Sequence, residues 1–323
     1  MKHYVVTGAA GFIGSRIVAA LNQRGISEII AVDNLPRGSD IRNLAGRRYQ
    51  DYFHHAEFLD RFDGAMQAVL HQGSCTDTTE YDRRLMMESN YEYSRRLLEK
   101  CQRAKVPLIY ASSAAVYGAG REFREVPACE RPLNVYAESK LRFDQLVRGL
   151  RQPAAQVAGL RYFNVYGPNE AHKAREKMAS MAYQAFNQLR ETGRIKLFTG
   201  SGGYGNGEQR RDFVFVDDVA AVNLWLLEND GVSGVFNCGT GSAQSFNQLA
   251  AAVINAVQGT SLGLEAIVEK GLIEYVPFPA GLQEKYQSFT QADLTRLRAA
   301  GYEGQFRSVE QGVAAYVEEL KRK

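Results

Sequence analysis

The sequence predicts an α/β fold built around a parallel β-sheet that helices cover on both faces. Short apolar runs alternate with longer amphipathic segments, which is typical of strands that alternate with helices. The first apolar run, residues 4–6, ends in a glycine turn that opens a helical pattern. The chain has 323 residues, 45% of them hydrophobic and 23% charged, which is enough for one large domain or two modest ones. These observations predict a Rossmann-type doubly wound parallel sheet with a smaller, discontinuous α/β substrate domain.

Strands and helices are expected to alternate along the first half of the chain. Strands are predicted at residues 4–6, 28–32, 68–71, 108–111 and 157–160. Helical spacing of apolar residues predicts helices at 12–24, 81–104 and 135–149. The later elements are predicted as a helix at 178–191, a strand at 213–216, a helix at 219–228, a strand at 235–238 and amphipathic segments to the end. The glycine-rich loop 200–207 is expected to be a flexible lid or a hairpin.

The composition limits the possible partners. Charges of both signs are interleaved and the formal net charge is +3, which argues against nucleic acid or a membrane surface as the main partner. Cys75, Cys101, Cys129 and Cys238 lie far apart, without a CxxC pair or a histidine at metal-ligand spacing. No signal-like leader or apolar run of about 18 residues is seen. We therefore expect a reduced, cytoplasmic protein without a structural metal.

The glycine turn carries the first functional signal. Gly8, Gly11 and Gly14 lie between a strand and a helix, where the backbone approaches a phosphate closely and helix N–H groups face it. Asp33 ends the second predicted strand, where a carboxylate accepts hydrogen bonds from an adenosine ribose. Strand, turn, helix, strand and acid in this order predict a bound dinucleotide.

The loosened alternation after residue 164 suggests a domain boundary that the chain crosses more than once. The dinucleotide-binding domain is expected to comprise residues 1–165, 212–238 and 288–313. The substrate domain is expected to comprise 166–211, 239–287 and the C-terminal tail.

The sequence leaves the choice between NAD and NADP open. Asp33 favours NAD, because a carboxylate repels a phosphate on the ribose. Asn34, Arg37 and Arg42 follow closely and could accommodate that phosphate.

Tyr136 and Lys140 form the second signal, because they stand at i and i+4 on one predicted helix and share a face. A neighbouring ammonium is expected to lower the pKa of the phenol and make it a usable base. The strand ending at residue 111 delivers Ser112 and Ser113 to the sheet edge where ligands bind in open α/β folds. After a dinucleotide signature, serine, tyrosine and lysine predict a hydride-transfer site. The structural alternatives are a phenol packed along a lysine stem, and serines that bind turn backbone.

The chain resembles the extended short-chain dehydrogenases/reductases, the class of nucleotide-sugar epimerases and dehydratases. Within that class it is similar over nearly its whole length to the ADP-heptose 6-epimerases. The matching segments are residues 71–80, 132–136, 161–168, 172–173, 178–180, 211–214, 245–246 and 286–294. The segment 172–173 and the run 286–294 are the narrower signatures, and they favour this subfamily.

The resemblance implies a role for each matching position. As catalytic residues it implies Tyr136, Lys140 and Ser113, with Lys173 as a second acid/base. Beyond the glycine turn, it implies cofactor contacts from Phe12, Ile13, Asp33, Asn34, Gly73, Ser74, Cys75, Thr76, Asp77, Asn90, Lys140, Val165 and Lys173. It implies substrate contacts from Ser113, Asn164, Ser180, Gln184, Phe198, Thr199, Gly200, Ser201, Arg211 and Tyr286. It also implies an ADP-heptose substrate, NADP as cofactor and a homo-oligomer, a pentamer or a multiple of one.

Some positions depart from the subfamily. Asp40 and His55 stand where the subfamily has lysines beside the adenosine, so NAD stays possible. Extra residues before Met178 make Lys177 a rival of Lys173. The loops 202–207 and 259–271 are longer than expected.

Inverting an unactivated alcohol carbon needs transient oxidation, because its C–H bond is not acidic. Proton transfer is needed on both sides of the intermediate carbonyl, which explains two acid/base groups, Tyr136 and Lys173. A 4,6-dehydratase would need acids where Ala114 and Ala115 stand. A UDP-hexose 4-epimerase with the single base Tyr136, or a non-catalytic NAD(P)-sensing module, are the alternatives.

Overall fold

The computed structural model describes residues 2–34, 41–77, 82–176, 178–279, 281, 283 and 286–322, with only the backbone at 175 and 176. Contacts divide the chain into two compact units. Unit 1 comprises Met1–Tyr162, Asp217–Cys238 and Leu294–Gly304. Unit 2 comprises Phe163–Val216, Gly239–Asp293 and Gln305–Lys323, so the chain passes between the units five times.

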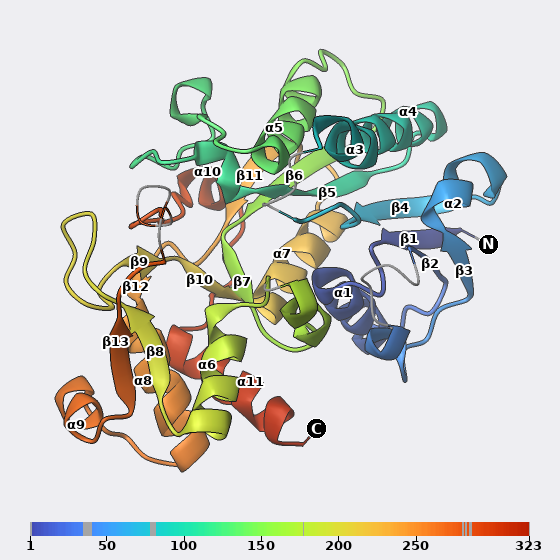
Figure 1. The fold of residues 1–323 in the computed structure, drawn as a ribbon. Coiled ribbons are helices and arrows are strands. Elements are labelled where there is room, and N and C mark those ends of the chain that lie inside the picture. The colour runs from blue at the N-terminus through green and yellow to red at the C-terminus, as the bar shows by residue number, and fades with distance from the viewer. Residues whose placement is uncertain are drawn as a thin grey trace. The chain divides into compact units, whose positions relative to one another are not determined.

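Unit 1 is built on a seven-stranded, all-parallel sheet in the order β11-β6-β5-β4-β1-β2-β3 (Figure 1). The strands are β1 His3–Thr7, β2 Ile29–Asp33, β3 Asp51–His54, β4 Met66–His71, β5 Leu108–Ser113, β6 Val157–Tyr162 and β11 Gly234–Cys238. The order runs outward from β1 in both directions, as in doubly wound sheets. The predicted Rossmann-type sheet is confirmed.

The sheet strands of unit 1 are apolar runs because both of their faces are covered. Every residue of β2 and β6 is buried. The edge strand β3 was not predicted, because Asp51–His54 is polar and only partly buried.

Helices lie on both faces of this sheet, with α3, α4 and α5 on one side and α1 and α7 on the other (Figure 1). The helices are α1 Phe12–Gln23, α2 His55–Arg61, α3 Arg83–Met86, α4 Tyr93–Ala104, α5 Val135–Arg148, α7 Val216–Glu228 and α10 Thr295–Ala299. Short helices are η1 Ile41–Leu44, η3 Ala114–Tyr117 and η4 Pro127–Cys129. The helix predicted at 81–104 contains a π-helical segment, η2 Met87–Glu92, between α3 and α4. Tyr81 lies outside the described residues.

In the part of unit 2 that the structure describes, there are three two-stranded sheets instead of one large sheet. The parallel pairs are β7 Asn164–Tyr166 with β10 Phe213–Phe215, and β8 Ile195–Phe198 with β13 Ile273–Val276; β9 Arg210–Arg211 and β12 Gln244–Ser245 are antiparallel. Its helices are α6 Met181–Thr192, α8 Phe246–Gln258, α9 Leu264–Glu269, α11 Val309–Lys321 and the short η5 Ala171–Glu176. Aliphatic and aromatic side chains from α6, α8, α11 and the strands form its core.

Several elements of unit 2 were missed by the sequence analysis. Of its strands only β10 was predicted, because the others are short runs with polar residues. In the loop 200–207, Ser201 and Tyr204 form an antiparallel bridge, so this segment is a tight hairpin. The long segment 259–271 contains helix α9.

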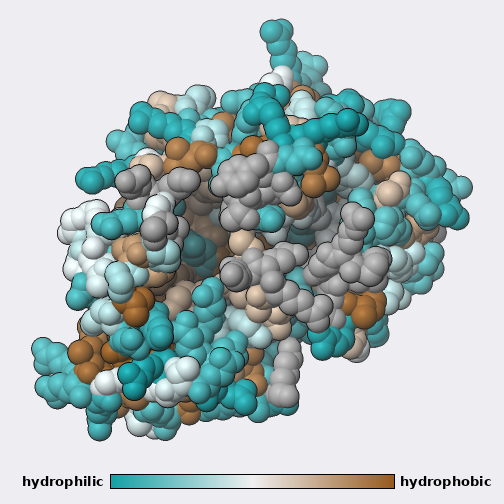
Figure 2. Space-filling model, in the orientation of Figure 1, coloured by the Kyte–Doolittle hydropathy of each residue, from teal (hydrophilic) through white to brown (hydrophobic). Residues whose placement is uncertain are grey.

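The face in Figure 2 is largely hydrophilic, with small hydrophobic patches separated by polar side chains. Throughout the described parts of the chain, no helix has both the length and the apolar composition that crossing a membrane requires.

Candidate active site

The glycine turn of unit 1 joins β1 to α1 in a backbone conformation that suits a phosphate. Gly8 has φ of 65°, and a Cβ there would lie 2.7 Å from the backbone nitrogen of Gly73. Helix α1 starts after Gly11 with no side-chain cap and no acidic residue in its first turn. Its first N–H groups therefore suit an anionic ligand, and these residues fit the diphosphate of a dinucleotide.

Asp33 is held at the end of β2 by backbone N–H groups. Its carboxylate accepts hydrogen bonds from the nitrogens of Ala10 at 2.7 Å and Asn34 at 2.6 Å. The unpredicted strand β3 supports this corner, because Tyr52 donates to the Asp33 carbonyl at 3.0 Å and His54 bonds the Asn34 side chain at 3.1 Å. Arg37 and Asp40 lie outside the described residues.

The loop Gly73–Asp77 follows β4 and is held by Asn90 of the π-helix. The Asn90 side chain accepts from the Cys75 nitrogen at 2.8 Å and donates to the Cys75 carbonyl at 3.0 Å. It also donates to the Ser139 hydroxyl on α5 at 3.1 Å. Asn90 is buried, so in this structure it fixes the loop and links it to the helix of Tyr136. Residues 78–80 of the matching segment lie outside the described residues.

Tyr136, Lys140 and Ser113 come together in unit 1. Asn134 caps α5 by accepting from the nitrogen of Ala137 at 2.8 Å, which places Tyr136 in the first turn. The Lys140 ammonium lies 5.9 Å from the centre of the Tyr136 ring and donates to the Ala111 carbonyl at 3.0 Å. Ser113 ends β5, and its hydroxyl is close enough to the Tyr136 side chain to lower the pKa of the phenol. The predicted triad is thus one spatial cluster.

The expected direction of the Tyr136 pKa was wrong for this structure. Burial raises the pKa of the phenol above its ordinary value, and the hydrogen bond with Ser113 only partly offsets this. Burial also lowers the pKa of Lys140 to about 8. Lys140 is directed at the Ala111 carbonyl rather than at the phenol oxygen, so sequence spacing overstated its influence on Tyr136.

Ser112, the other serine of this turn, has a structural role. Its hydroxyl donates to Asp144 at 2.9 Å, and Tyr110 donates to the same carboxylate at 2.9 Å. Asp144 also pairs with the fully buried Arg161 at 2.8 Å. This buried network supports the end of β5 that carries Ser113.

The sugar-side residues predicted in unit 2 lie on β7, on η5 and at the start of α6. Asn164 and Val165 are on β7, and the Asn164 side chain is within 3.4 Å of the Thr290 hydroxyl. Lys173 lies on η5, and Ser180 caps α6. The side-chain amide of Gln184 donates to the backbone carbonyl of Ala179 at 2.7 Å, so that donor binds the backbone just before its own helix. Lys177, the rival of Lys173, lies outside the described residues.

The nucleotide-side residues form an aromatic and cationic cluster in unit 2. The Arg211 guanidinium lies 5.0 Å from the ring centre of Tyr286 and 5.7 Å from that of Phe246. The Phe198 ring stacks on Phe278 at 4.4 Å and meets Tyr286 edge-on at 5.9 Å. Burial lowers the pKa of Arg211, but a guanidinium stays charged at neutral pH. Such a cluster suits an aromatic base joined to phosphates.

Thr199, Gly200 and Ser201 follow β8 at the base of the hairpin. The side chain of Gln209 donates to the Thr199 carbonyl at 2.8 Å and to the Ser201 hydroxyl at 3.2 Å. The Gly200 nitrogen donates to Asn206 at 2.9 Å. The hairpin thus fixes this segment beside Phe198.

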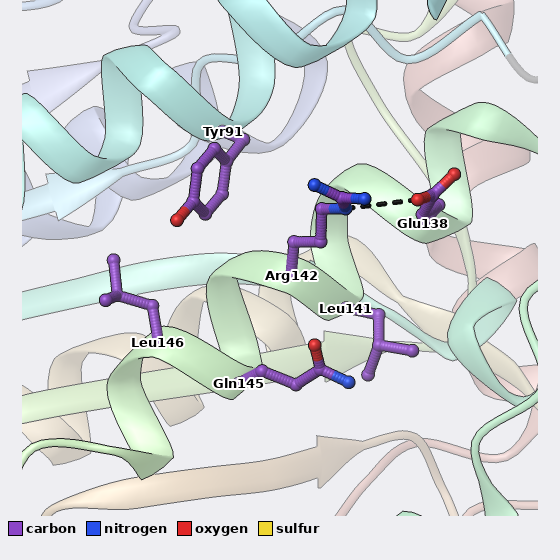
Figure 3. A pocket seen from close by; sticks show the side chains of 6 residues that line it. All are labelled: Tyr91, Glu138, Leu141, Arg142, Gln145 and Leu146. Atoms are coloured by element: carbon purple, nitrogen blue, oxygen red, sulfur yellow. Dashed lines mark hydrogen bonds and ion pairs between the residues drawn. The ribbon is translucent and has the colours of Figure 1, made fainter.

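A pocket of about 590 Å³ lies on α5, away from Tyr136 and Lys140. Tyr91 comes from η2, and the remaining lining residues, Glu138, Leu141, Arg142, Gln145 and Leu146, come from α5 (Figure 3). At 100° per residue, this stripe of α5 faces away from the stripe that carries Tyr136 and Lys140. Arg142 pairs with Glu138 across it at 3.0 Å. We therefore separate this pocket from the candidate active site.

A comparison with protein families matches residues 4–239 to the NAD dependent epimerase/dehydratase family. The chain belongs to this family. A family relative, the ADP-L-glycero-D-manno-heptose-6-epimerase of Thiobacillus denitrificans, is 53% identical over 99% of this chain and 98% of that protein.

Solved structures of the family agree with the fold. The ADP-L-glycero-D-manno-heptose-6-epimerase of Helicobacter pylori is 27% identical, with a TM-score of 0.82 over 100% of this chain and 97% of that chain. A Thermus thermophilus UDP-glucose 4-epimerase in complex with NAD is 26% identical, with a TM-score of 0.76 over 99% of both chains. The Ser113, Tyr136 and Lys140 cluster lies inside the matched family segment.

Proposed function

We propose that this chain is an epimerase that inverts C6 of the heptose in ADP-D-glycero-β-D-manno-heptose to give the ADP-L-glycero form, a precursor of the lipopolysaccharide core. The observation that carries the proposal is the cluster of Ser113, Tyr136 and Lys140. It stands in a chain 53% identical, over nearly its full length, to a 6-epimerase of this sugar nucleotide.

The reaction requires oxidation and re-reduction at one carbon. The C–H bond of a secondary alcohol is not acidic, so direct deprotonation cannot invert it. A nicotinamide cofactor, which the glycine turn and the loop Gly73–Asp77 would hold, would supply the hydride transfer from and back to this carbon. The protein must remove a hydroxyl proton, hold the carbonyl intermediate and protect it from water.

Tyr136 is the proposed base for the hydroxyl proton, and Ser113 is the proposed hydrogen-bond partner of the phenol. Because burial raises the pKa of Tyr136, its ionisation needs positive charge nearby. Lys140 supplies part of that charge, since its ammonium lies 5.9 Å from the ring centre. Lys173 is the proposed second acid/base, which serves the other face of the carbonyl.

The proposed cofactor is NADP, bound by the glycine turn, Asp33, Asn34 and the loop Gly73–Asp77. Arg42 follows Asp33 in sequence and supplies positive charge for a ribose phosphate. NAD is the competing cofactor, because the Asp33 carboxylate repels such a phosphate. The nucleotide released from the purified protein decides between them.

The proposed ADP contacts come from unit 2. Tyr286 and Phe198 offer ring faces and edges for adenine, and Arg211 offers a fork of N–H donors for the diphosphate. We also propose a cytoplasmic homo-oligomer, a pentamer or a multiple of one, which light scattering would test.

One experiment tests the function directly. The purified protein is denatured, the released nucleotide is identified, and intact protein is assayed with ADP-D-glycero-β-D-manno-heptose by NMR for inversion at C6. We expect NADP or NAD in the extract and an equilibrium mixture of the two heptose epimers. Turnover of UDP-galactose without inversion of the heptose would instead identify a UDP-hexose 4-epimerase.

A further inference from the structure

Glu170 is a buried carboxylate of unit 2 whose hydrogen bonds reach two residues far from each other in sequence. It is only 1% exposed. One carboxylate oxygen, Oε1, accepts from the Gly167 nitrogen at 3.1 Å and from the Ser180 hydroxyl at 2.7 Å, and Oε2 accepts from the Ser180 nitrogen at 2.6 Å. The buried side chain of Tyr316 lies near this carboxylate, whose charge contributes to raising the Tyr316 pKa after the larger effect of burial.

The backbone before Glu170 adopts conformations that few residues tolerate. Gly167 has φ of 140°, and a Cβ there would lie 2.7 Å from Cγ1 of Val216. Asn169 has φ of 77°, in the left-handed region. Such conformations cost free energy and persist only where surrounding contacts hold them. The carboxylate of Glu170 supplies such contacts at Gly167 and Ser180.

The hydrogen bonds of the Ser180 hydroxyl give it a defined direction. A serine hydroxyl has one hydrogen to donate and two lone pairs that accept. The Ser180 hydroxyl donates to Glu170, and one lone pair accepts from the Tyr183 nitrogen at 3.2 Å as the cap of α6. Among the described residues, only the second lone pair is left for a ligand. Toward a sugar, Ser180 can therefore accept a hydrogen bond but not donate one.

Glu170 also starts the turn that carries Lys173. The Lys173 nitrogen donates to the Glu170 carbonyl at 2.9 Å, and the Lys173 carbonyl accepts from the Met178 nitrogen at 2.9 Å. Burial raises the pKa of Glu170, and the hydrogen bonds from Ser180 and Gly167 and, last, the positive charge of Lys173 partly offset this rise. Both proposed sugar-side residues are thus tied to one acid.

We propose that Glu170 is a positioning residue, which orients the Ser180 hydroxyl as a hydrogen-bond acceptor for a hydroxyl of the sugar. The inference rests on the proposed function, since that function places Ser180 against the sugar. The direction of the Ser180–Glu170 hydrogen bond then selects a substrate group that donates a hydrogen bond, and it rejects a group that can only accept.

A double-mutant cycle tests this coupling. Ser180→Ala removes the acceptor, and Glu170→Gln removes the charge and lets the Ser180 hydroxyl turn away. We expect each single variant to raise KM for the ADP-heptose about tenfold. The double variant should also raise KM about tenfold rather than about a hundredfold, because both changes remove the same contact. Additive effects, or an unchanged KM in Glu170→Gln, would overturn the proposal.

Asn255→Ala is the matched control for a structural role. The Asn255 side chain makes three hydrogen bonds in unit 2, to the Leu262 nitrogen, the Leu262 carbonyl and the Thr260 hydroxyl, at 2.8, 3.0 and 2.8 Å. Its loss should lower the melting temperature without changing KM. If Glu170→Gln does not fold, Glu170→Asp replaces it, because it keeps the charge but retracts the carboxylate. An unchanged KM in that variant would equally overturn the proposal.

A second measurement needs no substrate. Hydrogen exchange of ligand-free protein is followed in peptides covering residues 164–183. The amides of Gly167 and Ser180 should exchange about tenfold faster in Glu170→Gln than in the wild type. Unchanged exchange would show that Glu170 does not hold these residues. If the wild type does not invert the heptose, the proposed function fails. The KM values of the double-mutant cycle are then measured with the nucleotide sugar that the wild type does turn over, and the same outcomes support or overturn the proposal.

Discussion

The two units hold their proposed site residues by different means. In unit 1, these residues follow strands of one large parallel sheet, with Gly8 after β1, Asp33 at the end of β2 and Ser113 at the end of β5. The shared edge of the sheet brings them to one side of the unit. Among the residues that the structure describes, each sheet of unit 2 has two strands, and such small sheets are marginally stable by themselves.

In unit 2, buried carboxylates hold separate chain segments together. Asp212 is fully buried, and its Oδ1 accepts from the nitrogen and hydroxyl of Thr240 at 2.7 and 2.8 Å. Its Oδ2 accepts from the nitrogens of Gly241 and Ala292, both at 2.9 Å. Asp212 thereby joins three separate chain segments, as Glu170 joins two. A substrate unit without a large sheet can thus fix its loops by acids that bind backbone N–H groups.

The largest expected effect tests the chemistry of unit 1. Tyr136→Phe should lower kcat by about 10³-fold, because the variant lacks the proposed base. Cofactor content, measured on the denatured protein, should stay at the wild-type level. Tyr91→Phe is the control, because Tyr91 lies on η2 and lines the pocket on the other side of α5. This variant should retain wild-type kcat. Retained activity in Tyr136→Phe would remove the hydride-transfer interpretation.

The next effect tests whether unit 2 contributes to the chemistry as well as to binding. Lys173→Met should abolish inversion, with a loss of kcat of about 10²–10³-fold, while cofactor content stays intact. Inversion is measured by NMR of the heptose. A wild-type rate would leave the chemistry to unit 1 alone and contradict the scheme with two acid/base groups.

Asp212→Asn tests the structural difference between the units. The amide nitrogen of the variant would face backbone N–H groups, so we expect the free energy of unfolding to fall by about 2–3 kcal/mol. Denaturant titration measures this. The control in unit 1 is Asp217→Asn, because Asp217 pairs with Arg16 at 2.7 Å and its side chain is 34% exposed. That variant should lose less than about 1 kcal/mol, and equal losses would contradict the comparison.

The smallest expected effect is the change in the free energy of unfolding with pH, which has opposite signs in unit 1 and unit 2. Burial, with a smaller contribution from Lys140, lowers the pKa of His71 to about 3 from its ordinary value of 6.5. Between these values the unfolded chain binds a proton that the folded unit 1 does not. The contribution of neutral His71 to the free energy of unfolding is therefore fully present above pH 6.5. It falls by up to about 1.4 kcal/mol for each pH unit between pH 6.5 and about 3.

Burial raises the pKa of Asp212 and of Glu170, so their contribution to the stability of unit 2 increases as pH falls. Unfolding of wild type and His71→Asn at pH 7 and pH 5 separates these effects. The variant should lose less stability between the two pH values than the wild type does. A parallel loss in both proteins would show that His71 does not set the acid sensitivity of unit 1.

The sequence analysis succeeded where local pattern determines structure. The strands of the central sheet were predictable because burial on both faces makes each a continuous apolar run, as in Ile29–Asp33. The pair Tyr136 and Lys140 was visible from its spacing on one helix. Glu170 and Asp212 were not assigned roles, because their partners lie in other segments and no local pattern marks them.

The position of β11 at the edge of the sheet has a consequence for synthesis on the ribosome. Strand β6 ends at Tyr162, but its neighbour β11 begins only at Gly234, after a long excursion through unit 2. Until residue 238 has left the exit tunnel, β6 presents an unpaired edge of buried, apolar residues. A nascent chain halted in this interval is open to misassociation, so we expect chaperone binding to peak between the emergence of β6 and that of β11.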